Sequence, residues 1–261
     1  MSHTAPAAVA ATHTPQLRDT LTDLSIAAER WLLIRYGTCA NPRRGYSYHN
    51  RCHGRDVAHA ARQLATVLAE ARRVPEETVY LAEYAGWCHD KAQGPGHEQR
   101  SARYAAAAMR RRGIPEQYIT TVQTMIAATR VVRVDGHRLV QAADPADLHQ
   151  AILADADLAS LGEPHGLYRA LLLCLEQEHL TGRICVSDPR HAAPDRSAVQ
   201  QFLTRQVQLL RTHRYLLDIS RRLWPHQQRH AEVLAQLLDL YTADRITYPD
   251  MLARARDYAM A

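Results

Sequence analysis

Residues 75–96 read PEETVYLAEYAGWCHDKAQGPG, the stretch of the chain that says most about its fold. Pro75 fits the first turn of a helix, where its missing N–H costs nothing, and a largely apolar run follows it. The run stops at His89-Asp90, and the Gly-Pro-Gly of residues 94–96 breaks the chain soon afterwards. We therefore expect a buried helix that ends at a histidine–aspartate pair and a loop.

Further helical segments, joined by short breaks, are predicted on both sides of this stretch. They cover residues 17–36, 48–72, 98–112, 115–129, 144–161, 164–181, 197–223 and 225–242, with a short helix from Tyr248 onward. Ala, Leu and Arg dominate the composition and are strong helix formers. Residues 131–141 are irregular, and their Asp135-Gly136 pair leaves a small hairpin open. The expected fold class is all-α, a bundle of about ten helices.

The chain length bounds the number of domains. With 261 residues, of which 46% are hydrophobic, the chain can form one large helical domain or two small ones. No internal repeat or clear linker divides it, so we predict a single domain over residues 17–261, with a core at 17–182 and C-terminal helices at 197–261. The alternative is that the last three helices form a separate lobe. Residues 1–16 are rich in Ala, Thr and Pro, and we expect a flexible tail there.

Cysteine usage, hydropathy and charge indicate the setting of the protein. Five irregularly spaced cysteines without a CxxC pair argue against a disulfide framework and favour the cytoplasm. The N-terminal stretch does not read as a secretory signal, and no segment approaches the roughly 20 apolar residues of a membrane span. The net charge of +5 comes from scattered basic residues, so a small phosphorylated molecule is a better expected partner than nucleic acid. A homo-oligomer remains open.

Three groups of histidine and aspartate residues carry the candidate chemistry. His49 and His53 are four residues apart, so on one helix both rings would point the same way. His89-Asp90 ends the apolar helix described above, where both side chains can converge on one ion. Asp155 and Asp157 lie in an otherwise apolar helical segment, where buried carboxylates need partners.

Two imidazoles and two carboxylates suit a divalent metal ion such as Mn, Mg, Co, Ni, Fe or Zn. Such an ion polarises a phosphoryl oxygen and lowers the pKa of a bound water, which is what hydrolysis of a phosphate ester requires. Each group alone is weak evidence, because isolated His-Asp pairs are mostly structural. Their order along the chain is what indicates a site.

That order, with its flanking residues, resembles the HD-domain metal-dependent phosphohydrolase superfamily over about residues 31–162. The motif YHNRCH at 48–53, with Val57 after it, looks like the opening motif of cyclic-nucleotide phosphodiesterases and of a bacterial branch of predicted metal-dependent HD phosphohydrolases. The bacterial branch fits better, because it also has segments similar to HEQRSA (97–102), IAAT (126–129) and DADLASLG (155–162). The resemblance implies an HD-type helical bundle.

The resemblance also implies roles for single residues. His53, His89, Asp90 and Asp157 would hold one divalent ion, or two, and Asp90 would also orient the attacking water. His49 resembles the phosphodiesterase histidine that protonates the leaving oxygen. Its spacing from His53 independently favours a position beside the metal site, which is what a general acid requires.

Five neighbouring residues are further candidates. Glu98 would orient the water or bond a ligand histidine. Lys91, Arg44 and Arg130 lie next to the motifs and could hold phosphate oxygens, although each also fits a solvated surface cation. His97 stands where the family has Asn, so we expect it to contact the substrate or to add a metal ligand.

The expected function is that of a cytoplasmic phosphohydrolase acting on a nucleotide or another small phosphate ester through metal-activated water. The chain lacks both the further histidine that phosphodiesterases place soon after His-Asp and the acidic pair that alarmone hydrolases have there, so neither substrate is assigned. One alternative is a mixed-valent di-iron oxygenase of the same superfamily. It needs two further histidines, for which His97, His137 and His149 are available. Another alternative is a non-catalytic HD fold that binds a ligand or a partner.

Overall fold

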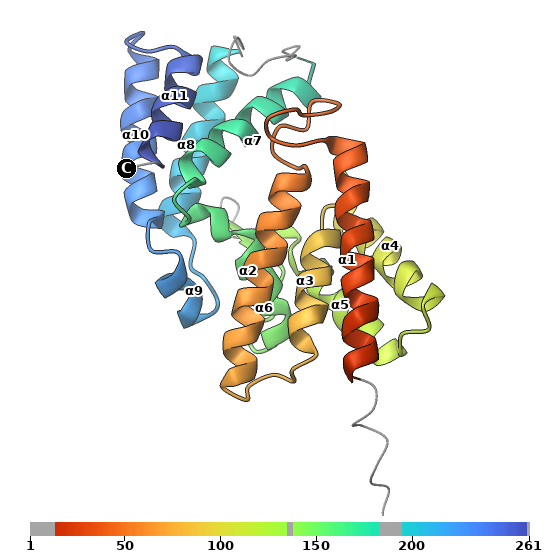
Figure 1. Cartoon of the computed structure of the whole chain (residues 1–261). Coiled ribbons are helices and arrows are strands. Elements are labelled where there is room, and N and C mark those ends of the chain that lie inside the picture. Colours follow the sequence, from red (N-terminus) through yellow and green to blue (C-terminus); the bar gives the residue numbers. More distant parts are fainter. Residues whose placement is uncertain (1–13, 135–137, 183–194, 260–261) are drawn as a thin grey trace, which may run out of the picture.

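The computed structural model describes residues 14–134, 138–182 and 195–259, and within these ranges the regular secondary structure is helical apart from one two-stranded hairpin (Figure 1). The first half contains α1 (Thr14–Tyr36), α2 (Arg51–Glu70), α3 (Thr78–Cys88), α4 (His97–Arg111), α5 (Glu116–Ala128), β1 (Val131–Val134), β2 (Arg138–Gln141), α6 (Leu148–Asp157) and the 3-10 helix η1 (Ala159–Leu161). The second half contains α7 (Gly166–Leu180), α8 (Arg196–Thr212), α9 (Asp218–Leu223), α10 (Gln227–Thr242) and α11 (Tyr248–Tyr258). Eleven α-helices in the described ranges confirm the expected all-α fold of about ten helices. No helix in these ranges is both long and apolar enough to span a bilayer.

The structure refines two predictions, the flexible tail over residues 1–16 and the irregular stretch over residues 131–141. Helix α1 begins at Thr14, so residues 14–16 are helical, and residues 1–13 lie outside the described ranges. The stretch at 131–141 forms the antiparallel hairpin that the sequence left open, with β1 and β2 paired along their length. The predicted turn at Asp135-Gly136 falls outside the residues that the structure describes.

Helix α3 lies in the middle of the first half. Nine of its eleven residues are buried, and it packs against α1, α2, α5 and α6. Figure 1 shows α1, α2 and α3 side by side. Gly86 of α3 faces Ala58 of α2, and a Cβ added to Gly86 would lie 2.6 Å from the Cα of Ala58. This approach is too close for any side chain, so glycine allows α2 and α3 to pack with their backbones in contact.

The buried hydrophobic side chains form two clusters. The first cluster belongs mainly to α1–α6 and the second to α7, α8, α10 and α11, of which α8, α10 and α11 stand together in Figure 1. Each half also contributes to the other cluster. Tyr215, Leu217 and Trp224 pack in the first cluster, and Tyr48 packs in the second. The single domain stays a prediction. Its physical rationale is that each half of the chain contributes side chains to the hydrophobic cluster of the other half.

The single long helix predicted over residues 197–223 is wrong. Helix α8 ends at Thr212 and α9 begins at Asp218. The buried carboxylate of Asp155, on α6, accepts three hydrogen bonds from the connection and the new helix: from the N–H of Leu216 (2.8 Å), the N–H of Leu217 (2.9 Å) and the hydroxyl of Ser220 (2.6 Å). A buried carboxylate without such donors would be costly. The break in the helix therefore satisfies Asp155, and Asp155 in turn caps α9.

Candidate metal centre

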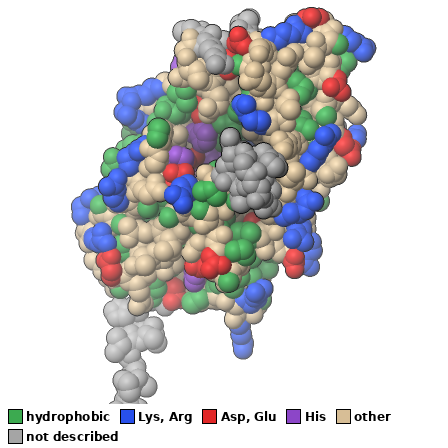
Figure 2. All heavy atoms as spheres, turned by 180° about the vertical axis from the view of Figure 1, so that it is seen from behind, with side chains coloured by type: hydrophobic (Ala, Val, Ile, Leu, Met, Phe, Trp, Pro, Cys, Tyr) green, Lys and Arg blue, Asp and Glu red, His purple; other side chains and the backbone are tan. Residues whose placement is uncertain are grey.

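Three helix ends meet at the candidate site. His53 lies in the first turn of α2, His89 directly follows α3, and Asp157 is the last residue of α6. Because α6 packs against both α2 and α3, the three side chains face one another. Figure 2 shows histidine and acidic side chains gathered in a hollow near the middle of one face of the molecule.

The distances between these side chains fit a metal ion. The ligand atoms of His53, His89 and Asp157 lie within 4.8 Å of one another. The Nε2 atoms of His53 and His89 are 3.2 Å apart. Oδ1 of Asp157 lies 3.4 Å from Nε2 of His53 and 3.3 Å from Nε2 of His89. Donor atoms that bind one ion at about 2.1 Å are separated by about 3.0–3.4 Å in octahedral or tetrahedral geometry. This group can therefore hold a divalent metal ion.

Asp90 places a second carboxylate beside the same imidazoles. Its Oδ2 is 3.2 Å from Nε2 of His89 and 3.4 Å from Nε2 of His53. Burial favours the neutral acid, but His89 and His49 outweigh burial and hold the pKa of Asp90 well below its usual range. Asp90 is therefore ionised, as a metal ligand must be.

The centre as a whole stabilises positive charge. Burial disfavours the imidazolium of His89, but the carboxylates of Asp90 and Asp157 outweigh burial and raise the pKa of His89 well above its usual value. The C-terminal ends of α3 and α6 also point their partial negative charge toward this region. A cation bound between these ligands would benefit from the same electrostatic field.

Hydrogen bonds from outside the group orient two of its members. Nδ1 of His89 donates to the carbonyl of Gly86 at 2.7 Å, which leaves Nε2 free to face the centre. Nε2 of Gln141, on β2, donates to Oδ2 of Asp157 at 3.0 Å and leaves Oδ1 facing the histidines. The sequence analysis did not identify Gln141, because its position depends on the hairpin.

His49 reaches the site by a different route from the one predicted. The helix predicted from Tyr48 begins instead at Arg51, because Asn50 is extended (φ −134°) and its side chain caps the new helix end. His49 therefore precedes α2 and does not share a helical face with His53. Their rings nevertheless meet, with centroids 5.6 Å apart, and Nε2 of His49 is 3.8 Å from Oδ2 of Asp90.

Glu176 of α7 holds His49 in this position. Its Oε1 bonds to Nδ1 of His49, and its Oε2 accepts the backbone N–H groups of Tyr48 (2.8 Å) and His49 (2.9 Å). Burial disfavours the imidazolium of His49, but Glu176 and Asp90 outweigh burial and raise its pKa to about 9. The sequence analysis missed Glu176. A lone acid directly after the apolar run of residues 170–175 was the available signal.

His97 and Glu98 form an outer layer at the start of α4. Nε2 of His97 is 3.3 Å from Oδ1 of Asp90. The other oxygen of this carboxylate, Oδ2, is the one that faces His53 and His89. Glu98 is buried, with Oε2 3.6 Å from Nδ1 of His97. Glu98 therefore reaches the centre through His97.

The three candidate phosphate-binding cations are not gathered around the centre. Arg44 and Lys91 line a separate hollow of about 360 Å³, in which Nζ of Lys91 lies 5.3 Å from the centre of the Trp31 ring. Arg130 is exposed just after α5 and lines neither that hollow nor the pocket at His53.

The histidines considered for a second iron also differ in position. His149 lies 3.3 Å from the hydroxyl of Thr78 and 3.6 Å from the carboxylate of Asp147, in a separate set of contacts from the centre. His137 lies outside the described residues. His97 alone of these three is placed at the centre by the described part of the chain.

Comparison with other proteins yields no match: neither a family model, nor a curated protein, nor a solved structure matches this chain. The resemblance to HD-domain phosphohydrolases therefore rests on the motif residues alone. The geometry of the centre is an independent observation on the same residues.

Proposed function

We propose that the protein is a metal-dependent phosphohydrolase that cleaves a small phosphate ester. The observation that carries the proposal is the convergence of two buried histidines and two carboxylates from three helix ends, with a third histidine beside them. His53, His89, Asp90 and Asp157 would hold the ion. His49, fixed by its bond to Glu176, would serve as the general acid.

Each residue of the centre has a role that its position supports. A bound divalent ion would polarise a phosphoryl oxygen and lower the pKa of the attacking water. Asp90 would accept a hydrogen bond from the attacking water and orient it toward phosphorus. As the new P–O bond forms and the ester P–O bond breaks, Nε2 of His49 gives its proton to the leaving oxygen. Glu176 keeps the imidazole oriented, and the proton released by water restores His49.

The number of ions depends on His97. Its Nε2 lies 3.3 Å from Oδ1 of Asp90, so His97 is the residue of the described part of the centre that could add a ligand for a second ion. Metal analysis of the wild type and of His97→Ala decides this point. Two ions per chain in the wild type and one in the variant would indicate a two-ion centre, whereas one ion per chain in both proteins would indicate a one-ion centre.

The proposal is tested by metal analysis and by turnover of phosphomonoesters and phosphodiesters with Mn, Mg, Co, Ni, Fe or Zn. We expect Asp90→Asn to lower kcat by roughly 100-fold or more, because the variant loses a ligand and the group that orients water. Asp218→Asn is the matched control, since that side chain is 91% exposed on α9. Full turnover in Asp90→Asn would contradict the proposal. Metal binding without turnover of any ester by the wild type would instead support a non-catalytic module.

A further inference from the structure

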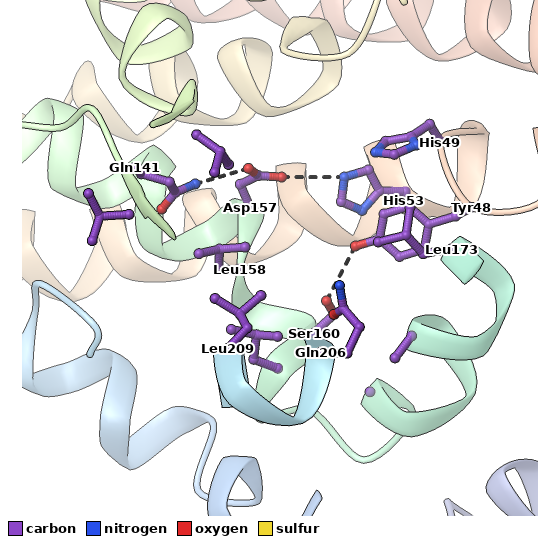
Figure 3. Close-up of a pocket in the computed structure, with 15 residues that line it drawn as sticks. Tyr48, His49, His53, Gln141, Asp157, Leu158, Ser160, Leu173, Gln206 and Leu209 are labelled. Atoms are coloured by element: carbon purple, nitrogen blue, oxygen red, sulfur yellow. Dashed lines mark hydrogen bonds and ion pairs between the residues drawn. The ribbon is translucent and has the colours of Figure 1, made fainter. Parts of the chain in front are cut away.

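An apolar pocket adjoins the metal centre. It has a volume of about 230 Å³ and opens beside His49, His53 and Asp157 (Figure 3). Figure 3 shows these three side chains on one side of the pocket, with Leu158 and Leu209 on another. A group attached to a phosphate at the centre would therefore extend directly into this space.

The walls of the pocket come from elements far apart in the sequence. The hairpin contributes Val131 and Val140, and the segment directly after α6 contributes Leu158 and Leu161. Leu173 comes from α7 and Leu209 from α8. The C-terminal helices therefore complete a pocket whose polar end belongs to the first half of the chain.

Apart from His49, His53 and Asp157, the polar side chains of the pocket wall are Tyr48, Gln141, Ser160 and Gln206, and three of these four already contact a protein partner. Gln141 donates to Asp157 at 3.0 Å, and the hydroxyl of Ser160 lies 3.4 Å from that of Tyr48. A nucleobase or ribose buried here would leave several of its own polar groups unpaired, which is unfavourable. An alkyl or aryl group would lose no hydrogen bonds on entering and would gain from burial of its surface.

We propose that this pocket receives an apolar leaving group, so that the substrate class is the phosphate esters of small hydrophobic alcohols or phenols rather than nucleotides. The inference rests on the proposed function for the bond that is cleaved, but the pocket itself can be tested separately. A volume of about 230 Å³ lies below the range of about 300–1,000 Å³ that is typical of ligand pockets. It therefore suits a short alkyl chain or a single aromatic ring.

The first test compares kcat/KM for phosphate esters of straight-chain alcohols from methanol to octanol, as monoesters and as methyl diesters, with nucleoside 5′-monophosphates. We expect kcat/KM to rise roughly threefold to tenfold per methylene until the pocket is full, and then to level off. A flat series, or nucleotides that are cleaved better than every alkyl ester, would overturn the inference.

The second test measures binding, so that the inference does not depend on hydrolysis. Titration calorimetry with methylphosphonate and octylphosphonate, on the protein with and without Mn, should show tighter binding of the octyl compound by roughly 100-fold or more. Tighter octylphosphonate binding without turnover of any ester would contradict the proposed function but keep the pocket. Equal affinities would overturn the inference whatever the activity.

Two variants locate the effect in the pocket. Leu209→Gln places an amide on the α8 wall and should flatten the dependence of binding on chain length. Leu240→Gln is the matched control, because Leu240 is also half-buried in the C-terminal helices but lies outside the pocket lining. A steep dependence retained in Leu209→Gln and lost in Leu240→Gln would contradict the assignment. The wild-type series remains decisive if either variant fails to fold.

Discussion

Glu176 is the residue that turns His49 from a loop side chain into a fixed part of the centre. Its carboxylate is fully buried and bonds both to the ring and to two backbone N–H groups of the segment before α2. Without it, the imidazole would be free to rotate away from Asp90. Catalysis by a positioned acid depends on such geometry more strongly than on substrate affinity.

We therefore expect Glu176→Gln to lower kcat by about 10–100-fold while KM and metal content change little. Steady-state kinetics and metal analysis, taken together, check this. Glu232→Gln is the control, since that side chain is 49% exposed on α10. Loss of metal in Glu176→Gln would show that Glu176 supports the ligands instead of the acid.

The protonation of His213 makes the stability of the fold depend on pH. Burial, and then the charge of Arg214, lower the pKa of this histidine to about 4. In the unfolded chain its pKa is about 6.5, so the unfolded state binds the proton more readily between these values. The contribution of neutral His213 to stability is therefore complete above pH 6.5 and is lost as the pH falls toward 4.

Replacing His213 with Gln removes this titration. The free energy of unfolding should fall less steeply between pH 6.5 and pH 4 in the variant, by at most about 3 kcal/mol over the whole interval. Denaturant unfolding at four pH values in this range measures the slope. His226→Gln is the control, because His226 is exposed. Parallel slopes for His213→Gln and the wild type would contradict the prediction.

At the scale of elements, the positions of helix ends determine the centre. The close contact of α2 with α3 requires Gly86, and this contact brings the start of one helix to the end of the other. Helix α6 serves two purposes within three residues. Asp157 faces the candidate metal centre, whereas Asp155 accepts a hydrogen bond from Ser220 of α9.

These two aspartates are therefore expected to respond differently to substitution. Asp155→Ala leaves three donors without their acceptor and should lower the free energy of unfolding by about 3 kcal/mol or more. Asp157→Asn should lower metal content with a smaller effect on the unfolding of the metal-free protein. Unfolding curves and metal analysis on both variants check the contrast. Equal loss of stability in the metal-free proteins would mean that the division of roles is wrong.

At the scale of the whole molecule, the two halves of the chain depend on each other. Tyr215, Leu217 and Trp224 complete the first hydrophobic cluster, and α7 supplies Glu176 to the centre. The apolar pocket likewise needs walls from both halves. The single domain predicted from the sequence stays a prediction, and this shared packing is the reason to test it against a separate C-terminal lobe.

A chain that ends at residue 182 tests this dependence. We expect it to lose fixed tertiary packing, because it exposes the first cluster where those three side chains pack and leaves Asp155 unpaired. Near-ultraviolet circular dichroism and resistance to proteolysis, compared with the full chain, measure the loss. A truncated chain that unfolds cooperatively at the temperature of the full chain would show that the last helices form an independent lobe.

The sequence by itself determined the helical class, most helix positions and the candidate ligands His53, His89, Asp90 and Asp157. These features depend on residue type and on spacing within a few turns, which local patterns report. The resemblance to HD phosphohydrolases drew on the same local motifs. The resemblance stays a prediction; the structure shows that His53, His89 and Asp157 lie together, and the local motifs do not say how they are held.

Only the tertiary structure decided what surrounds those ligands. The partners in question are far apart along the chain: 127 positions separate His49 from Glu176, and 65 separate Asp155 from Ser220. Such contacts also overrode local preference, since α8 stops to satisfy Asp155 and α2 starts after His49. The apolar pocket exists for the same reason. Its walls meet only when the two hydrophobic clusters pack together, because burial of apolar surface is decided by the whole chain.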